Sequence, residues 1–189
     1  LHTAWHVKWD NLKLASDVYY AKSPDWGVTW YAANGNLLPT VPMPATGADP
    51  VAKGFESYLH DEGWYSRLYT SICIDVDGQP IVAFNDANST NPQLCVAKFN
   101  HENDAWDITK VNMFGKDVAF MEIERGHDDN LLVTIVRKEP GSTTNNYSCD
   151  FTICYRDVEG NWFFQNLTDD DHWEGRVLDI KYHPAYSVY

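Results

Sequence analysis

The sequence lacks three features that would each point to a different class of protein. No apolar run approaches the roughly 20 residues that a bilayer-spanning helix needs. Basic residues are scarce: 14 Lys and Arg stand against 27 Asp and Glu, giving a formal net charge of −13. No stretch keeps a helical periodicity over several turns. We therefore expect a protein without a membrane span, without a nucleic-acid partner and with little helix.

Metal-binding patterns are also missing. The four cysteines lack metal-finger spacing. Cys149 and Cys154 would lie on opposite faces of one strand, so we do not expect them to bond to each other. Asp75 with Asp77, and the run 169–171, offer hard oxygen ligands, but neither matches a twelve-residue calcium loop. We interpret Asp75 to Gly78 as a hairpin turn and the acidic run as a solvated loop. The sequence thus predicts no metal site and no cofactor.

Aromatic residues are abundant instead. Eight Trp, 11 Tyr and 8 Phe in 189 residues suit stacked sheets and also sugar-binding surfaces. Leu1 opens in strand-like sequence rather than in a signal peptide, so we expect the chain to start within a fold or after processing. Glycosylation sequons at Asn88, Asn146 and Asn166 favour an extracellular, secreted protein.

A repeat runs along the chain. Three segments share the order of an apolar strand, a polar loop, a second strand, a turn and a Trp; they begin at Leu1, Pro80 and Leu131. Tyr20-Ala21-Lys22, Val96-Ala97-Lys98 and Cys154-Tyr155-Arg156 take one equivalent place, and Trp30, Trp106 and Trp162 follow eight, eight and six residues later. A further strand is predicted ahead of each turn signal: Ser71 to Asp75, Val118 to Glu124 and Arg176 to Tyr182. Four-stranded repeats with turns about every ten residues predict an all-β protein built of β-propeller blades.

The repeat divides the chain into about three four-stranded antiparallel blades. Their approximate bounds are 1–70, 71–115 and 116–170, with the start of a fourth at 171–189. Because propellers typically close with about four to eight blades, we expect a fragment of a larger propeller. The remaining blades would come from the parent chain or from another subunit.

One stretch carries a family resemblance. Residues 23–30 spell Ser-x-Asp-x-Gly-x-Thr-Trp, in which Gly27 can take the positive φ of a tight hairpin. Asp25 and Ser23 can accept hydrogen bonds from the exposed backbone N–H groups, and Trp30 can begin the next strand and pack beneath the turn. The stretch resembles the Asp-box of the sialidase-type (BNR repeat) β-propellers, with Ser23, Asp25, Gly27, Thr29 and Trp30 at its defining positions. We expect a structural role for it, since it falls in a hairpin away from the usual ligand face.

Two longer stretches resemble the BNR-4 group of these propellers. They are residues 1–9 followed by 16–30, and the run Ile74 to Phe84, which is similar to the start of that group's next blade. The group includes secreted polysaccharide lyases that act on uronic-acid polymers such as ulvan. Those lyases are understood to use His and Tyr for proton transfer, with an Arg near the uronate carboxylate. The second His of that set has no counterpart here, because Tyr20 and its neighbours fill its place.

Propeller topology predicts where a ligand would bind. The loops between second and third strands, with the connections between blades, share the face where such propellers usually bind ligands. The longest loop, 36–66, contains four prolines and joins the first two blades on that face. We predict four catalytic candidates in or beside it: His60, Tyr65, Arg67 and His6. The alternative is that this loop is a strap covering the seam between blades.

Further candidates fall on the same face. The predicted substrate-binding residues are Trp9, Asn11, Trp64, Asn85, His172, Trp173 and Arg176. His6 aligns with Asn85 near the upper end of the second strand of each blade, where a His can also serve a structural role. The Trp residues could stack on sugar rings or pack in the core. His101, His127 and His183 fall in turns of the opposite face and are not candidates.

Four functions fit these patterns, with a polysaccharide or glycan as partner in all but the last. The best hypothesis is a carbohydrate-active lyase that performs β-elimination on a uronic-acid polymer, with Arg67 or Arg176 neutralising the carboxylate. A non-catalytic carbohydrate-binding or adhesive propeller needs the aromatics but no proton-transfer pair. A sialidase-like hydrolase would need an arginine cluster, for which five arginines are few. A purely structural role within a surface assembly also stays open.

Overall fold

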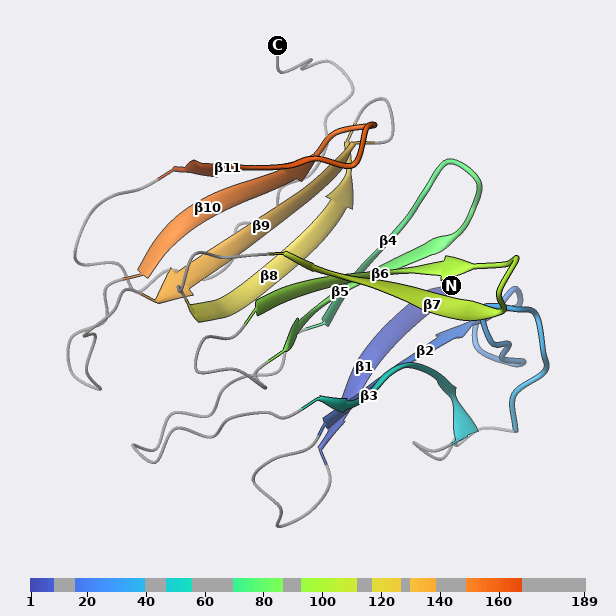
Figure 1. Ribbon diagram of the computed structural model, residues 1–189. Coiled ribbons are helices and arrows are strands. Elements are labelled where there is room, and N and C mark those ends of the chain that lie inside the picture. Colours follow the sequence, from blue (N-terminus) through green and yellow to red (C-terminus); the bar gives the residue numbers. More distant parts are fainter. Residues whose placement is uncertain are drawn as a thin grey trace.

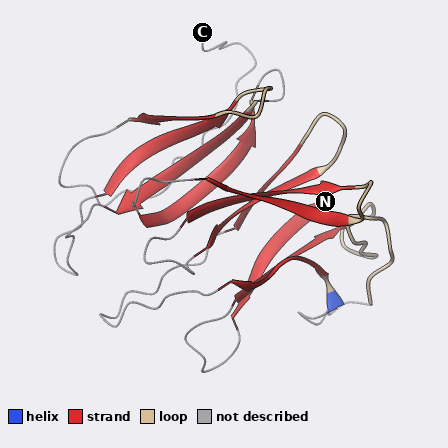
Figure 2. Ribbon diagram, in the orientation of Figure 1, coloured by secondary structure: helices blue, strands red, loops and turns tan. Residues whose placement is uncertain are grey.

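The protein is built from three antiparallel sheets, which confirms the all-β class and its propeller blades. The computed structural model describes residues 1–8, 16–39, 47–55, 70–86, 93–111, 117–126, 130–138 and 149–167 (Figure 1). Strands make up most of the described residues, as Figure 2 shows. Within these ranges, none of the secondary structure is a helix with the length and apolar character to traverse a bilayer.

The first sheet contains β1 (His2–Lys8), β2 (Ser16–Lys22) and β3 (Asp49–Phe55), in that order. The prediction that Trp30 begins its outer strand is wrong, as is the prediction of an uninterrupted loop over 36–66. Tyr31 forms only isolated bridges to Lys22 and Leu37, because a turn at Gly35, with φ of 89°, redirects the chain. The outer strand is β3, which pairs with β2 through register shifts.

The other two sheets have four strands each, in sequence order. The second sheet comprises β4 (Thr70–Ile74), β5 (Pro80–Asp86), β6 (Gln93–Asn100) and β7 (Ala105–Val111). The third comprises β8 (Asp117–Arg125), β9 (Leu131–Lys138), β10 (Cys149–Arg156) and β11 (Trp162–Asn166). Their strands match the alternating and apolar runs of the sequence repeat.

The sheets lie side by side with β1, β4 and β8 along one shared edge (Figure 1). The hydroxyl of Thr70 in β4 donates to the carbonyl of Ala4 in β1 at 3.5 Å. Ser71, also in β4, accepts the backbone N–H of Ile123 in β8 at 3.0 Å. Because β4 and β8, the first strands of their sheets, contact each other, they are the inner strands of those two blades. Strand β1 matches β5 in the sequence repeat, so it is the second strand of its blade and the innermost of the three described there.

Two apolar seams hold the sheets together. Side chains that alternate along β5 explain why both exist: Val82 and Phe84 pack toward the first sheet, and Ile81 and Ala83 toward the third. All four are at most 3% exposed. The short continuous apolar run of β5 is therefore the signature of a strand buried on both faces.

The two ends of the sheets differ in character. The hairpins β4–β5, β6–β7, β8–β9 and β10–β11 share one end with the turn of residues 23–30, and we call it the hairpin end. The opposite end, where β1 ends at Lys8 and β5 ends at Asp86, is the loop end. It is the end that the sequence predicts as the ligand face.

The cysteines behave as the sequence predicts. Cys73, Cys95 and Cys154 form no disulfide, so Cys154 is not bonded to Cys149. Burial, with a smaller effect of nearby Asp75, raises the pKa of the Cys73 thiol to about 12. That thiol therefore stays protonated and unreactive at neutral pH.

Candidate functional site

His6 lies near the loop end of β1, the first of the three described strands of the first sheet. It stands opposite Val18, on the same face as Ala4, which packs against the seam with the second sheet. Its side chain is half-buried. An imidazole in this position stands at the edge of the described sheet, two residues from the end of the ladder at Lys8.

Asn85 occupies the matching position in the second sheet. It stands opposite Leu94 and shares a face with Ile81 and Ala83, so its side chain points toward the third sheet and is 4% exposed. His6 and Asn85 thus share one place in the repeat, each facing the next sheet. They point into different seams, and the structure does not bring their side chains together.

The remaining predicted site residues lie outside the described residues. The set comprises His60, Trp64, Tyr65 and Arg67 of the connection 56–69, Trp9 and Asn11 of the connection 9–15, and His172, Trp173 and Arg176 beyond residue 167. The described anchors of the first connection are Phe55, which pairs with Ser16, and Thr70, which pairs with Phe84. Both anchors belong to the loop-end half of their sheets.

A cluster that the sequence analysis missed lies on the other face of the first sheet. The phenol of Tyr19 donates a hydrogen bond to Asp17 Oδ2 at 3.0 Å, and Trp5 stacks on the Tyr19 ring with centroids 6.2 Å apart. Burial, then the bond to Asp17, raises the pKa of Tyr19. The phenol is therefore a proton donor at neutral pH. The alternation Asp17, Tyr19 along one strand face, with Trp5 directly opposite, was the available signal.

The turn of residues 23–30 is held by its own side chains. Asp25 accepts the Thr29 backbone N–H at 2.8 Å and the Thr29 hydroxyl at 2.6 Å, while Ser23 Oγ accepts the Gly27 N–H at 2.7 Å. The Trp30 indole N–H donates to the Gly27 carbonyl, and Gly27 has φ of 95°. These are the contacts that the sequence predicts for a tight turn. The side-chain groups that make them are hydrogen-bonded within the turn itself.

The hydrogen bonds of Thr29 lower the pKa of Asp25 to about 2. Because each of these donors favours the ionised carboxylate, Asp25 stays charged well below neutral pH. A carboxylate held in this way can order a hairpin, but it is a poor proton acceptor. The turn is therefore unsuited to acid–base chemistry.

The hairpin β4–β5 also closes on an aspartate. Asp75 Oδ1 accepts the backbone N–H groups of Asp77 and Gln79 at 3.0 and 2.7 Å, and Asp75 Oδ2 pairs with Lys98 Nζ at 2.8 Å. Burial alone would raise the pKa of Asp75, but these partners lower it on balance. The prediction of a turn here is confirmed. Among the described residues, no three His, Cys, Asp or Glu side chains gather into a metal-binding group.

The chain matches a model of a known protein family. A family model described as a BNR repeat-containing family member matches residues 1–114, which include the first two sheets. A search of curated proteins returned no match to the sequence.

Proposed function

Because the chain belongs to the BNR repeat-containing family, we propose that it is a carbohydrate-active propeller whose ligand site is at the loop end of its sheets. The position of His6 carries the proposal. It supplies a titratable side chain at the loop end of β1, half-buried and facing the neighbouring sheet. That combination of partial burial and access suits proton transfer.

The reaction that best suits the residues is β-elimination on a uronic-acid polymer. Arg67 or Arg176 would bind the uronate carboxylate and stabilise the charge that develops on it. His6, His60 or Tyr65 would remove the proton α to the carboxylate; the released electron pair forms a carbon–carbon double bond as the glycosidic C–O bond breaks. A second His or Tyr would protonate the leaving oxygen. Trp9, Trp64 and Trp173 would stack on the sugar rings.

A sialidase-like hydrolase is less well supported. That chemistry needs several arginines converging on one carboxylate. Arg125 and Arg156 stand at the hairpin end, whereas Arg137 lies near the far end of β9. The three described arginines therefore do not converge at the loop end.

The proposal includes secretion, so that the chain meets its polymer outside the cell. The exposed side chain of Asn166, at the loop end of β11, supports it, because this residue heads a glycosylation sequon.

The proposal is tested by ultraviolet absorbance during incubation with a panel of uronic-acid polysaccharides. A lyase produces a rising signal from the new double bond, and His6→Ala lowers the rate about 100-fold or more. His2→Gln is the matched control, because His2 shares the strand and face of His6 but stands at the hairpin end. A flat trace with retained polymer binding would replace the lyase by a carbohydrate-binding propeller; neither signal nor binding would refute both.

A further inference from the structure

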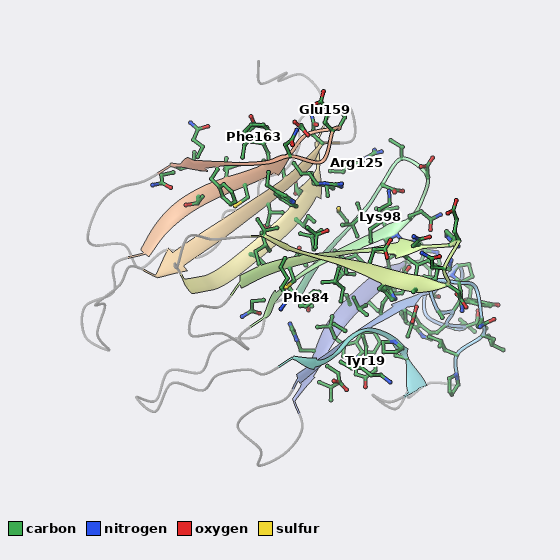
Figure 3. All side chains as sticks on the ribbon, in the orientation of Figure 1. Tyr19, Phe84, Lys98, Arg125, Glu159 and Phe163 are labelled. Atoms are coloured by element: carbon green, nitrogen blue, oxygen red, sulfur yellow. The ribbon has the colours of Figure 1, made fainter. Side chains whose placement is uncertain are left out.

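A cleft of about 500 Å³ opens at the hairpin end between the second and third sheets. Its size suits a small ligand or a few sugar units. On one wall, cross-strand pairing places Ile81, Lys98 and Asp107 in a row that faces the third sheet. On the other wall, Leu131, Arg156 and Trp162 form a row that faces back. Figure 3 shows Lys98 at the hairpin end of the second sheet.

A one-residue shift in register creates this convergence. The sequence repeat makes Lys98 and Arg156 equivalent, and Lys98 stands opposite Ile81. Arg156 stands opposite Leu131, which aligns with Pro80 rather than with Ile81. Since a shift of one residue moves a side chain to the other face of its sheet, Arg156 points toward the second sheet instead of away from it. The expected equivalence of Arg156 with Lys98 is wrong in this respect.

Arg156 is the cation that the cleft leaves available. Lys98 is already paired with Asp75, and Asp107 accepts a hydrogen bond from Asn100 Nδ2 at 2.8 Å. Arg156 forms no ion pair within the described part of the chain. Its guanidinium lies along the turn at Gly160, where a β-carbon would come within 3.2 Å of Nη2. The absence of that β-carbon leaves room for the guanidinium beside the turn.

Trp162 supplies a second unused group. Its indole N–H is buried and has no acceptor among the described residues, although the ring packs against the seam core. A buried donor without an acceptor is costly. Because the ring lines the cleft, a turn of the indole that brings this N–H to a ligand oxygen would relieve that cost. Arg156 and Trp162 are directly opposite each other on neighbouring strands, so both donors serve one small region.

We infer that this cleft binds an acidic sugar, with the carboxylate of a uronic-acid unit on the Arg156 guanidinium and a ring or hydroxyl oxygen on the Trp162 indole N–H. Guanidinium and carboxylate match in a two-pronged geometry. Asp107 and Thr109, which line the same cleft, are acceptors for sugar hydroxyls. The choice of a sugar rests on the proposed function, but this second site is at the end opposite to the proposed catalytic one.

The test is an NMR titration of the nitrogen-15-labelled chain with trigalacturonate. Trp162→Phe identifies the Trp162 indole signal, and we expect trigalacturonate to shift that signal in the wild-type chain. Arg156→Gln should weaken the affinity about 10- to 100-fold, and Arg156→Lys should restore it only in part. Lys53→Gln is the control for loss of one positive charge, because Lys53 is exposed on β3 of the first sheet, and it should leave the affinity unchanged.

Several results would overturn the inference. A stationary Trp162 signal at saturating trigalacturonate would do so, as would equal binding of the neutral maltotriose or of sulfate. Equal affinity of Arg156→Gln and wild type would remove the assigned role of Arg156. His6→Ala should leave the Trp162 response intact. A wild-type chain that lacks lyase activity but still shows the shift would refute the proposed reaction and keep this site.

Discussion

Trp26 combines two features that are individually uncommon. Its backbone φ is 59°, in the left-handed region, and its side chain is 90% exposed. For a bulky residue the left-handed region is strained, whereas Asn tolerates it. Trp26 therefore destabilises the turn that the hydrogen bonds of Asp25 stabilise.

We predict that Trp26→Asn stabilises the protein by about 1 kcal/mol, since it relieves backbone strain without removing a buried contact. Urea unfolding monitored by circular dichroism measures the change. Val28→Asn is the control, because Val28 is 77% exposed but is not among the residues with positive φ. An equal gain in both variants would assign the effect to surface hydrophobicity rather than to strain.

The charge of Asp25 makes the turn of residues 23–30 sensitive to acid. Its folded-state pKa of about 2 lies below the ordinary value of 3.8, so the unfolded chain takes up this proton first as pH falls. The stabilisation by Asp25 is thus complete above about pH 4 and is lost as pH falls toward 2. Urea midpoints across this range should fall more steeply for wild type than for Asp25→Asn. Parallel curves would show that Asp25 does not contribute.

At the scale of the element, hairpin β4–β5 depends on a buried carboxylate. Asp75→Ala removes the acceptor of two backbone N–H groups and the partner of Lys98. We expect a loss of about 2–4 kcal/mol in the free energy of unfolding. Asp77→Ala, two residues away and exposed, should change it by about 0.5 kcal/mol or less. Similar losses in the two variants would contradict the role given to Asp75.

Most elements could be predicted from the sequence because their pattern is local. Strands β4 and β5 and the hairpin between them are predicted by the apolar run Ile81 to Phe84 and by the Asp77-Gly78 turn. Strand β3 could not be predicted: it contains Pro50 and Gly54, and its partner β2 lies far back in the chain. The repeat did not predict which face of its sheet Arg156 occupies, because a register shift of one residue leaves almost no trace in the sequence.

At the scale of the whole molecule, stacking of the sheets buries the central strands of a sheet more fully than its outermost strand. Strands β5 and β6 have hydrogen-bonded neighbours on both sides and buried residues on both faces. Strands β7 and β11 are outermost in their sheets, and most of their residues are exposed. Protection of backbone amides should follow this difference.

We predict that amides of β5 and β6 exchange with deuterium at least about tenfold more slowly than those of β7 and β11. Hydrogen–deuterium exchange with peptide-level mass spectrometry measures this. Equal protection of β11 would mean that something covers the free edge of the third sheet.

The propeller class could be predicted from the repeat, and the family match supports it over residues 1–114. The candidate site was predictable only in part. His6 and Asn85 occupy equivalent strand ends, as the repeat implies, but the loops that carry the other candidates have no repeating pattern. Loop sequences encode ligand contacts rather than a shared backbone, so periodicity gives no information about their arrangement.

Each strand of the second and third sheets pairs only with its neighbours in sequence. Every such ladder can therefore form across a connection of ten residues or fewer, without a search across distant parts of the chain. The seams between sheets join residues much farther apart, so their formation carries the larger entropic barrier. The order of events in folding follows: hairpins first, whole blades next, and the docking of blade on blade as the slow step.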